Sequence, residues 1–294
     1  MKRMKRIKRM KVFSRKSLSE SILHICVSLL FATVCASYVY ILLWSVMAGA
    51  KTHTEIVLHP FGLPTEWHWE HFVEVFTSLN VGGHNFWDML FNSLFFSVGG
   101  TLITQITTAS FAYCCTRYKF PGSDLPYTII LIMMTLPIYG MGGSTYKILY
   151  NLGFINSYSY ILTSIAGMSA GFLYYRAYFQ NMSWSYVEAA QMDGANDFDI
   201  YIKVMLPMAK PIFGALFLTG WLSSWNSYST ALVHYPEIPT LPVGIYQFNI
   251  EMMYRARLDI LFAACVLVCL PALVLFAMFS KIITTNVSLG GLKG

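Results

Sequence analysis

The chain has 294 residues, of which 56% are hydrophobic and only 12% are charged, and its formal net charge is +6. Soluble domains carry about 25% charged residues, so this composition excludes an ordinary water-soluble protein and makes lipid the solvent for much of the surface. The positive charge is concentrated at the N-terminus rather than spread along the chain.

The first sixteen residues contain nine lysines and arginines and directly precede an apolar stretch. Such a run can bind nucleic acid, but in this position it is typical of a cytoplasmic anchor that sets membrane topology. We therefore interpret residues 1–21 as a basic cytoplasmic tail and residues 22–294 as one transmembrane domain.

Six apolar stretches are long enough to cross the hydrocarbon core, which requires about 20 mostly apolar residues. They cover residues 22–48, 90–114, 126–149, 158–180, 211–234 and 259–282. With these spans, sixteen of the 20 lysines and arginines lie on the side of the N-terminus. The positive-inside rule then predicts an all-α polytopic membrane protein with both termini in the cytoplasm. Arg255 and Arg257 are the main exception, because both lie on the outer side.

The longest outer loop, residues 50–89, is rich in histidine and tryptophan. His68 and His71 flank Glu70, but two histidines three residues apart without a clear third ligand are weak evidence for a metal site. Aromatic residues beside a membrane are common interfacial anchors. We expect no metal site on this chain, and we expect the loop to contact an extracellular partner.

Residues 183–210, between the fourth and fifth predicted spans, contain two short helical patterns. Ser183 is placed to cap the first helix, and Gly194 supplies the left-handed conformation that ends it. Asn196 is placed to cap the second helix, which Pro207 should stop. The segment is therefore expected to form a helix-turn-helix at the cytoplasmic membrane face.

The second helix of this pair is predicted to be amphipathic. Phe198, Ile202 and Met205 recur at i, i+4 and i+7 and would share one face, and Asp199 occupies the position of a capping-box acid. An amphipathic pair can lie on lipid or insert into a cytoplasmic protein. Because Lys203 is one of few cations in the segment, a protein partner is favoured.

The spacing of this segment resembles the EAA signature of the inner-membrane permeases of ABC importers. The matching residues are Glu188, Ala189, Ala190, Gly194, Val204, Leu206 and Pro207, with valine in place of isoleucine as the only departure. Shorter matches resemble the carbohydrate branch of that family, including maltose-type second permeases. They are Asp193-Gly194-Ala195, Trp225-Asn226, the segment 241–244 and the C-terminal residues 291–294.

The resemblance implies a division of labour between subunits. The EAA helices of such permeases dock on separate ATP-hydrolysing subunits, whose closure drives alternating access. The implied partners are a second homologous permease, two subunits that bind ATP and Mg²⁺, and an extracellular or periplasmic sugar-binding protein, all at a bacterial inner membrane. The sequence agrees, because a phosphate-binding loop ends in Gly-Lys-Ser/Thr and the chain contains no Gly-Lys pair. We expect no catalytic residue and no cofactor on this chain.

The resemblance also assigns roles within the coupling segment. Glu188 would face the ATPase or brace the loop, the two alanines would permit close approach, and Gly194 would form the turn. The full set of expected ATPase-coupling residues is Glu188, Ala189, Ala190, Asp193, Gly194, Val204, Leu206 and Pro207.

Polar side chains form stripes along the second and fifth predicted spans. The second contains Ser97, Thr101, Thr104, Gln105 and Thr108, and the fifth contains the substrate-pathway candidates Trp221, Ser223, Trp225, Asn226 and Ser227. Amide and hydroxyl groups beside aromatic faces suit a neutral, hydroxyl-rich ligand such as a sugar. Helix packing is the alternative, since small polar residues also mediate contacts between membrane helices.

Three other functions remain open at this point. An ABC permease for amino acids or peptides would carry the same EAA pattern. An ion-coupled secondary carrier or a membrane scaffold would also be polytopic, but the absence of acidic residues from the middle of the spans argues against proton coupling.

Overall fold

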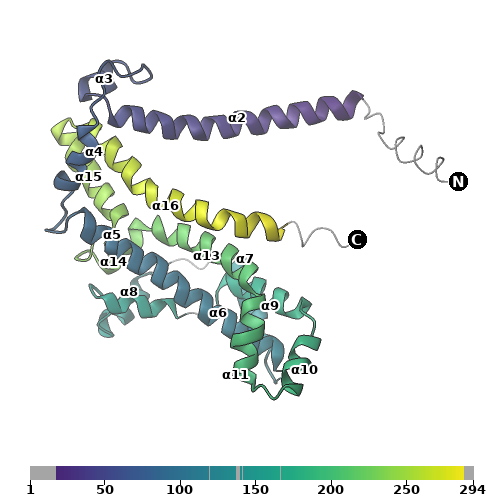
Figure 1. Cartoon of the computed structure of the whole chain (residues 1–294). Coiled ribbons are helices and arrows are strands. Elements are labelled where there is room, and N and C mark those ends of the chain that lie inside the picture. The colour runs from purple at the N-terminus through teal and green to yellow at the C-terminus, as the bar shows by residue number, and fades with distance from the viewer. Residues whose placement is uncertain (1–17, 119, 137–139, 141, 166, 288–294) are drawn as a thin grey trace.

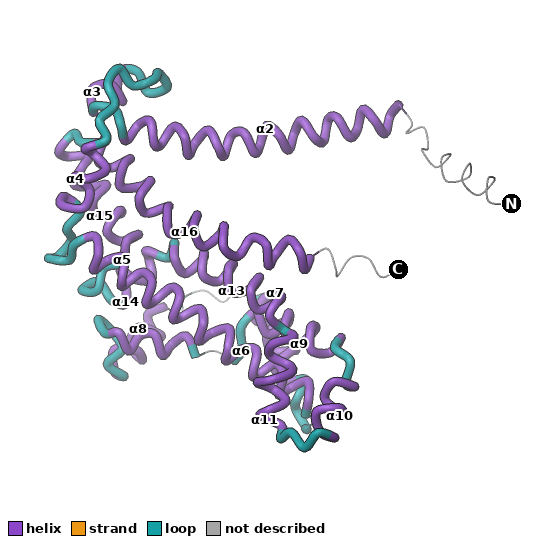
Figure 2. The backbone as a smooth tube through the Cα atoms, in the orientation of Figure 1, coloured by secondary structure: helices purple, strands orange, loops and turns teal. Residues whose placement is uncertain are grey.

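The structure is a computed structural model that describes residues 18–118, 120–136, 140, 142–165 and 167–287. Within these residues the fold is helical and contains no β-strand. Most of the predicted basic tail, residues 1–17, lies outside the described part. Figure 1 shows a bundle of helices from which one long helix stands apart, and Figure 2 shows that short loops join most of the elements.

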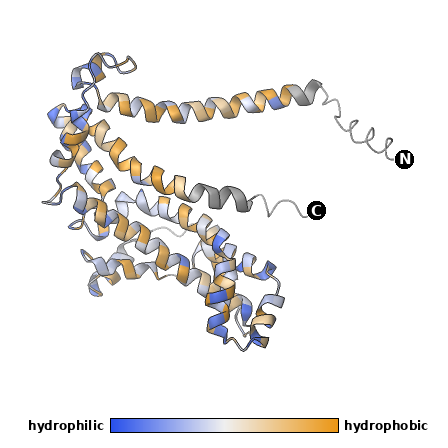
Figure 3. Ribbon diagram, viewed as in Figure 1, coloured by the Kyte–Doolittle hydropathy of each residue, from blue (hydrophilic) through white to orange (hydrophobic). Residues whose placement is uncertain are grey.

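The separate helix is α2 (Leu18–Gly49), which corresponds to the first predicted span. It approaches α16 (Leu258–Val287), the sixth predicted span, only near its C-terminal end (Figure 1). There the rings of Trp44 and Phe262 meet edge to face at 5.1 Å. A Cβ atom on Gly49 would lie 2.8 Å from the backbone nitrogen of Ala263, so only glycine permits this approach. The rest of α2 exposes apolar side chains, as the colouring of Figure 3 shows.

The second predicted span is part of one long helix built from three pieces. These are α5 (Phe86–Leu94), the π-helical turn η1 (Phe95–Gly99) and α6 (Gly100–Arg117). Asn85 caps its start and accepts hydrogen bonds from the backbone N–H groups of Trp87 and Asp88. This helix ends on the cytoplasmic side of the predicted topology.

The third, fourth and fifth predicted spans are interrupted in the structure. The third is divided into α7 (Leu125–Thr135) and α8 (Gly142–Asn151), and the fourth into the 3-10 helix η2 (Tyr158–Ser164) and α9 (Ala170–Asn181). The fifth begins as α13 (Lys210–Trp225) and continues, after a break, as α14 (Tyr228–His234).

Three helices among the described residues are long and apolar enough to cross a membrane, or four if one bent pair counts as a span. The three are Ile22–Gly49, Phe86–Arg117 and Leu258–Met278, and the bent pair joins Asp197–Met208 to Lys210–Trp225 at 71°. The structure is therefore a helical protein with several membrane-spanning candidates. The number of six spans and the cytoplasmic position of the termini stay predictions.

Two of the three apolar clusters among the described residues, called here the first and the second core, hold most of the bundle together. The first is formed by α5, α13, α16, α4 (Glu70–Ser78) and α15 (Leu241–Arg255), with Trp221 fully buried at its centre. The second joins α6 and α9 to the segment between α9 and α13, around Phe172, Tyr175 and Phe179. Phe213 of α13 packs against both cores. Helix α13 is thus the element that connects them.

An ionic network closes the end of the bundle that carries α3 (His53–Leu58) and α4, called here the outer end after its predicted orientation. Arg257 donates from both terminal nitrogens to Glu74, at 3.3 and 3.0 Å, and from Nε to Asp259 at 3.0 Å. Burial alone would lower the pKa of Arg257, but its hydrogen bonds with Glu74 and its attraction to Asp259 raise it. Arg255 pairs with Glu251 at 2.6 Å. Both arginines that depart from the positive-inside pattern are therefore paired with acidic groups.

Candidate functional site

The segment between α9 and α13 forms the predicted pair of helices. The first is α10 (Ser185–Met192), and the second begins as α11 (Asp197–Ile200). Gly194 has φ of +80°, which confirms the left-handed turn between them. Asn196 caps α11, since its Oδ1 accepts a hydrogen bond of 2.8 Å from the backbone of Asp199. The turn and the second cap are thus as predicted.

Three details of this segment differ from the prediction. The N-cap of α10 is Trp184, one residue after Ser183, although the hydroxyl of Ser183 accepts a hydrogen bond of 3.4 Å from the backbone N–H of Ser185. The carboxylate of Asp199 pairs with Lys203 at 2.6 Å instead of closing a capping box. Pro207 does not stop the helix.

The second helix passes through a π-helical turn and ends at Met208, one residue beyond the predicted stop. This turn, η3 (Tyr201–Met205), leads into α12 (Leu206–Met208), which contains Pro207 in its first turn. Proline lacks the N–H group that a helix interior needs, and the helix ends one residue after Pro207. The bend of 71° that leads to α13 therefore comes after Met208. Pro211 lies in the first turn of α13, as predicted.

The predicted apolar face of the second helix is confirmed only in part. Met205 is buried, but Phe198 is 74% exposed and Ile202 is 41% exposed. The side chains that pack on the second core are Ile200, Tyr201 and Met205. A π turn contains one residue more than an α-helical turn and so rotates the faces on its two sides relative to each other. The exposed face is therefore free for a partner.

The expected ATPase-coupling residues fall into two groups. Glu188, Ala189, Asp193 and Gly194 are exposed, on α10 and in the turn that follows it. Ala190, Val204, Leu206 and Pro207 are half-buried, and two of them, Ala190 and Leu206, pack against the second core. The exposed group, together with Met192 at 88% exposure, forms the tip of the helix pair.

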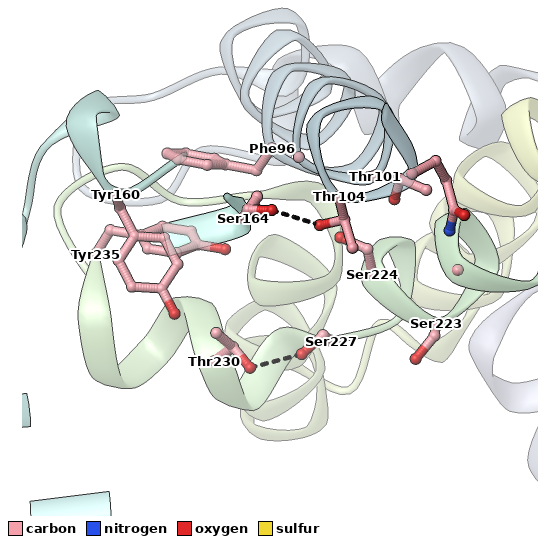
Figure 4. Close-up of a pocket in the computed structure, with 13 residues that line it drawn as sticks. Phe96, Thr101, Thr104, Tyr160, Ser164, Ser223, Ser224, Ser227, Thr230 and Tyr235 are labelled. Atoms are coloured by element: carbon pink, nitrogen blue, oxygen red, sulfur yellow. Dashed lines mark hydrogen bonds between the residues drawn. The ribbon is translucent and has the colours of Figure 1, made fainter. Parts of the chain in front are cut away.

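A polar cavity of about 340 Å³ lies between η1, α6, η2, α13 and α14 (Figure 4). Its lining residues are Phe96, Gly100, Thr101, Thr104, Gln105, Tyr160, Ser164, Gly220, Ser223, Ser224, Ser227, Thr230 and Tyr235. None of them is charged. The cavity thus offers hydroxyl, amide and aromatic groups in a site without a formal charge.

One side of the cavity is aromatic and the other carries hydroxyl groups. The rings of Phe96 and Tyr235 are stacked at 4.3 Å, and that of Tyr160 lies 5.0 Å from Tyr235. Across the cavity, the hydroxyls of Ser227 and Thr230 lie 2.7 Å apart (Figure 4). An apolar ring beside several polar contacts suits a ligand with an apolar face and a hydroxylated edge.

Gln105 and Thr104 connect the cavity wall to three other helices. Gln105 donates to the carbonyl of Leu216 at 3.3 Å and accepts from the hydroxyl of Tyr175 at 2.9 Å. Thr104 donates to the carbonyl of Ser164 at 2.9 Å. These bonds hold α6 against α13, α9 and the end of η2, and so set the width of the cavity.

The substrate-pathway candidates of the fifth span do not lie together. Ser223 and Ser227 line the polar cavity. Trp221 is buried in the first core, where its indole N–H donates to the hydroxyl of Ser97 at 3.0 Å. Trp225 and Asn226 line a separate cavity of about 290 Å³ between α13, α15 and α16. The roles of all five residues stay predictions.

Several lining residues were missed by the sequence analysis. Tyr160 and Ser164 belong to η2, within a stretch that was predicted to be a continuous span, and Tyr235 follows the end of α14. No spacing rule connects these residues with α6. They meet only because the fourth and fifth spans are interrupted.

The outer loop brings possible metal ligands together. Ligand atoms of His68, Glu70 and His71 all lie within 4.8 Å of one another. His68 and Glu70 form a hydrogen bond of 2.7 Å, and the pKa of Glu70 is lowered by hydrogen bonds to its backbone and to His68. The nitrogens of His71 face the carbonyl of Gly49 at 3.1 Å and the carboxylate of Asp259 at 3.4 Å. The three side chains thus already have hydrogen-bond or ion-pair partners within the protein. The expectation of no metal site stays a prediction.

The comparisons with known proteins agree on a transporter subunit. Residues 105–288 match the family described as "Binding-protein-dependent transport system inner membrane component". The arabinooligosaccharides transport system permease protein AraQ of Bacillus subtilis is 26% identical over 95% of this chain and 99% of its own length. The diacetylchitobiose uptake system permease protein NgcG of Streptomyces coelicolor is 30% identical over 85% of this chain and 82% of its own length.

One solved structure has the same fold. A chain of a bacterial ABC transporter involved in the import of the acidic polysaccharide alginate superposes with a TM-score of 0.75. The match covers 90% of this chain and 98% of that one, with 23% sequence identity.

Proposed function

We propose that this chain, which belongs to the family of binding-protein-dependent transport system inner membrane components, is one permease subunit of an ATP-driven importer for a neutral sugar or oligosaccharide. The uncharged polar cavity carries the proposal of substrate class. Two of the relatives support it, because their names describe transport of arabinooligosaccharides and diacetylchitobiose. The chain would work by alternating access and would not itself be an enzyme.

The lining of the cavity favours a neutral substrate over an acidic one. Proteins usually bind carboxylates with arginine or lysine, because these side chains supply charge as well as hydrogen bonds. The lining contains neither residue. Hydroxyl groups beside stacked aromatic rings instead match the two kinds of surface of a sugar ring. We therefore infer that the substrate differs in charge from alginate.

The cytoplasmic helix pair is the proposed coupling element. Its exposed tip, which contains Glu188 and Gly194, offers an apolar and acidic surface to a cytoplasmic partner together with the exposed side chain of Phe198. Two ATP-binding subunits that hold ATP and Mg²⁺ would dock there, and a second permease would complete the translocation path. A sugar-binding protein would deliver substrate at the outer end, in a bacterial inner membrane. The proposed topology has six spans and cytoplasmic termini.

The first experiment is affinity purification of the tagged chain in a mild detergent, followed by mass spectrometry. We expect stoichiometric recovery of an ATPase and a second permease. The complex is then placed in vesicles with its binding protein, and ATP hydrolysis is measured with neutral oligosaccharides and with alginate oligosaccharides. Recovery of the folded chain alone would favour a secondary carrier, and stimulation by the acidic sugars alone would contradict the neutral substrate class.

A substitution in the cavity tests the substrate route. Ser223→Trp places a large side chain in the cavity and should abolish uptake while the complex still assembles. Ser37→Trp is the matched control, because Ser37 is an exposed residue of α2 whose hydroxyl bonds only to the preceding turn. Uptake that survives Ser223→Trp unchanged would remove this cavity from the path.

A further inference from the structure

A single side chain at the C-terminal end of α6 contacts both helices of the cytoplasmic pair. The guanidinium carbon of Arg117 lies 5.1 Å from the ring centre of Trp184, the N-cap of α10. Its Nη2 lies 3.7 Å from the carboxylate of Asp197, the first residue of α11. The side chain of Arg117 is only 18% exposed. A planar cation can stack on an aromatic ring and pair with a carboxylate at once, so Arg117 holds the starts of both helices against α6.

A second contact attaches the helix pair to α6 about two helical turns before Arg117. The hydroxyl of Tyr201, in η3, lies 2.8 Å from that of Ser110. The ring of Tyr201 also packs on that of Tyr113 at 4.8 Å. Both Ser110 and Tyr113 belong to α6. The pair is therefore attached to this helix at two levels and moves with it.

The other end of α6 forms the wall of the polar cavity, through Thr101, Thr104 and Gln105. From Gln105 to Arg117, α6 advances by 12 residue steps, or about 18 Å of continuous α-helix at 1.5 Å per step. The direct chain connection from the pair to α13 is instead bent by 71°. Because α6 has no such break, it is the straighter mechanical link between the helix pair and the cavity (Figure 1).

We propose that Arg117 is a positioning residue that transmits movement of the cytoplasmic helix pair to α6 and thereby opens or closes the polar cavity. This inference rests on the proposed function, because it assumes that an ATPase moves the pair. Coupling between distant sites is carried by packed side chains and rigid helices that are shared by both sites. Loss of Arg117 would leave the ATPase docked but would loosen its connection to the cavity.

The chain contains a matched control for a general role in stability. Arg176 also forms an ion pair with an aspartate, Asp124, and its guanidinium carbon lies 4.8 Å from the ring centre of Tyr127. Its side chain is 12% exposed. These contacts join α9 to the start of α7 and do not involve the helix pair. Arg176→Gln therefore removes the same chemistry from a neighbouring place.

The test compares Arg117→Gln, Arg117→Lys and Arg176→Gln in the complex that co-purifies with the tagged chain. The measured quantity is the number of ATP molecules hydrolysed per sugar transported into vesicles. Arg117→Gln should raise this ratio by about fivefold, a typical size for a change within a coupling network, while the ATPase still co-purifies. Arg117→Lys keeps the charge but loses the planar stack on Trp184, so it should restore only part of the coupling. An unchanged ratio in Arg117→Gln, or an equal rise in Arg176→Gln, would overturn the proposal.

A second measurement separates this proposal from the proposed function. Hydrogen exchange of the backbone amides in residues 185–200 reports whether the helix pair is held, and it needs no transport. Arg117→Gln should accelerate exchange there, whereas Arg176→Gln should not. If the wild-type complex fails to couple uptake to ATP, the proposed function is wrong. If it couples but exchange in residues 185–200 is unaffected by Arg117→Gln, the positioning role is wrong.

Discussion

Each end of the molecule is held by an arginine, and the two arrangements differ in burial and in geometry. At the outer end, Arg257 makes close hydrogen bonds to Glu74 and to Asp259, and Asp259 is only 3% exposed. At the cytoplasmic end, Arg117 and Asp197 are 3.7 Å apart, and the side chain of Asp197 is 53% exposed. Removing the cation from a buried carboxylate such as Asp259 is costly, whereas a pair with a half-exposed carboxylate such as Asp197 is screened by water and contributes little.

From this difference we predict that the outer end is the more rigid of the two. The outer network joins α4 to the start of α16, and Gly49 brings the end of α2 into backbone contact with α16 close by. The contacts of Arg117 hold the starts of the two helices, while the tip of the pair stays exposed. This combination would suit the proposed drive by a cytoplasmic ATPase, since force applied to one end moves the helices only if the other end resists. The following substitutions test this comparison of the two ends by their effect on the free energy of unfolding.

The largest expected effect is that of Gly49→Val at the outer end. The new side chain would collide with the backbone of Ala263, which cannot move aside as a flexible side chain would. We expect the free energy of unfolding to fall by about 3 kcal/mol. The measurement is unfolding by SDS in mixed micelles, followed by tryptophan fluorescence. Gly143→Val is the control, because a Cβ at Gly143 meets no atom within 4 Å. Equal losses in both variants would show that the close contact is unimportant.

Arg257→Ala should have the next largest effect. It leaves the buried carboxylate of Asp259 without its principal cation and also releases Glu74. Because Arg257 and Glu74 are themselves partly exposed, we expect a loss of about 2 kcal/mol, below the range for fully buried pairs. Arg255→Ala removes an exposed pair within one helix and should cost only about 0.4 kcal/mol. If Arg257→Ala and Arg255→Ala lowered the free energy of unfolding by a similar small amount, a rigid outer end would be contradicted.

Gly194→Ala tests the turn between the cytoplasmic helices. A Cβ there meets no atom, but φ of +80° is unfavourable for any residue with a side chain. The expected cost is about 1 kcal/mol, confined to the helix pair and seen as faster amide exchange in residues 185–200. In contrast, Gly143 lies within α8 and has an ordinary φ, so Gly143→Ala should leave the stability unchanged or raise it. Unchanged exchange in Gly194→Ala would show that the turn can adopt another conformation.

Arg117→Gln should have the smallest effect on stability. A half-exposed ion pair and a single ring contact together contribute about 1 kcal/mol or less. SDS unfolding of this variant should therefore differ little from that of the wild type, although its coupling should change severalfold. A loss as large as that of Arg257→Ala would mean that the two ends are equally rigid.

Features set by neighbouring residues were predictable from the sequence. Gly194 and Asn196 act through the backbone within three residues of themselves, so their turn and cap follow from local geometry. Pro211 likewise marks the start of α13. The position of the coupling segment between α9 and α13 could be predicted for the same reason.

Features that depend on contacts between distant segments were not predictable. The π turn after Ile200 turns Phe198 outward, and no residue pattern announces it. Trp221 was placed on the path because it lies beside a polar stripe, but its indole is buried against Ser97, 124 residues away. The aromatic side of the cavity, with Tyr160 and Tyr235, forms only after η2 and the end of α14 come together.

The uncharged lining of the cavity has an electrical consequence. An elementary charge that crosses 100 mV of membrane potential gains or loses about 2.3 kcal/mol. On the proposed route, a neutral sugar would pass Thr101, Ser223 and Tyr235, would meet no fixed charge in the lining and would carry none itself. The sugar's own passage is therefore electrically silent. A cell whose membrane is depolarised would keep the same driving force for this substrate as long as its ATP lasts.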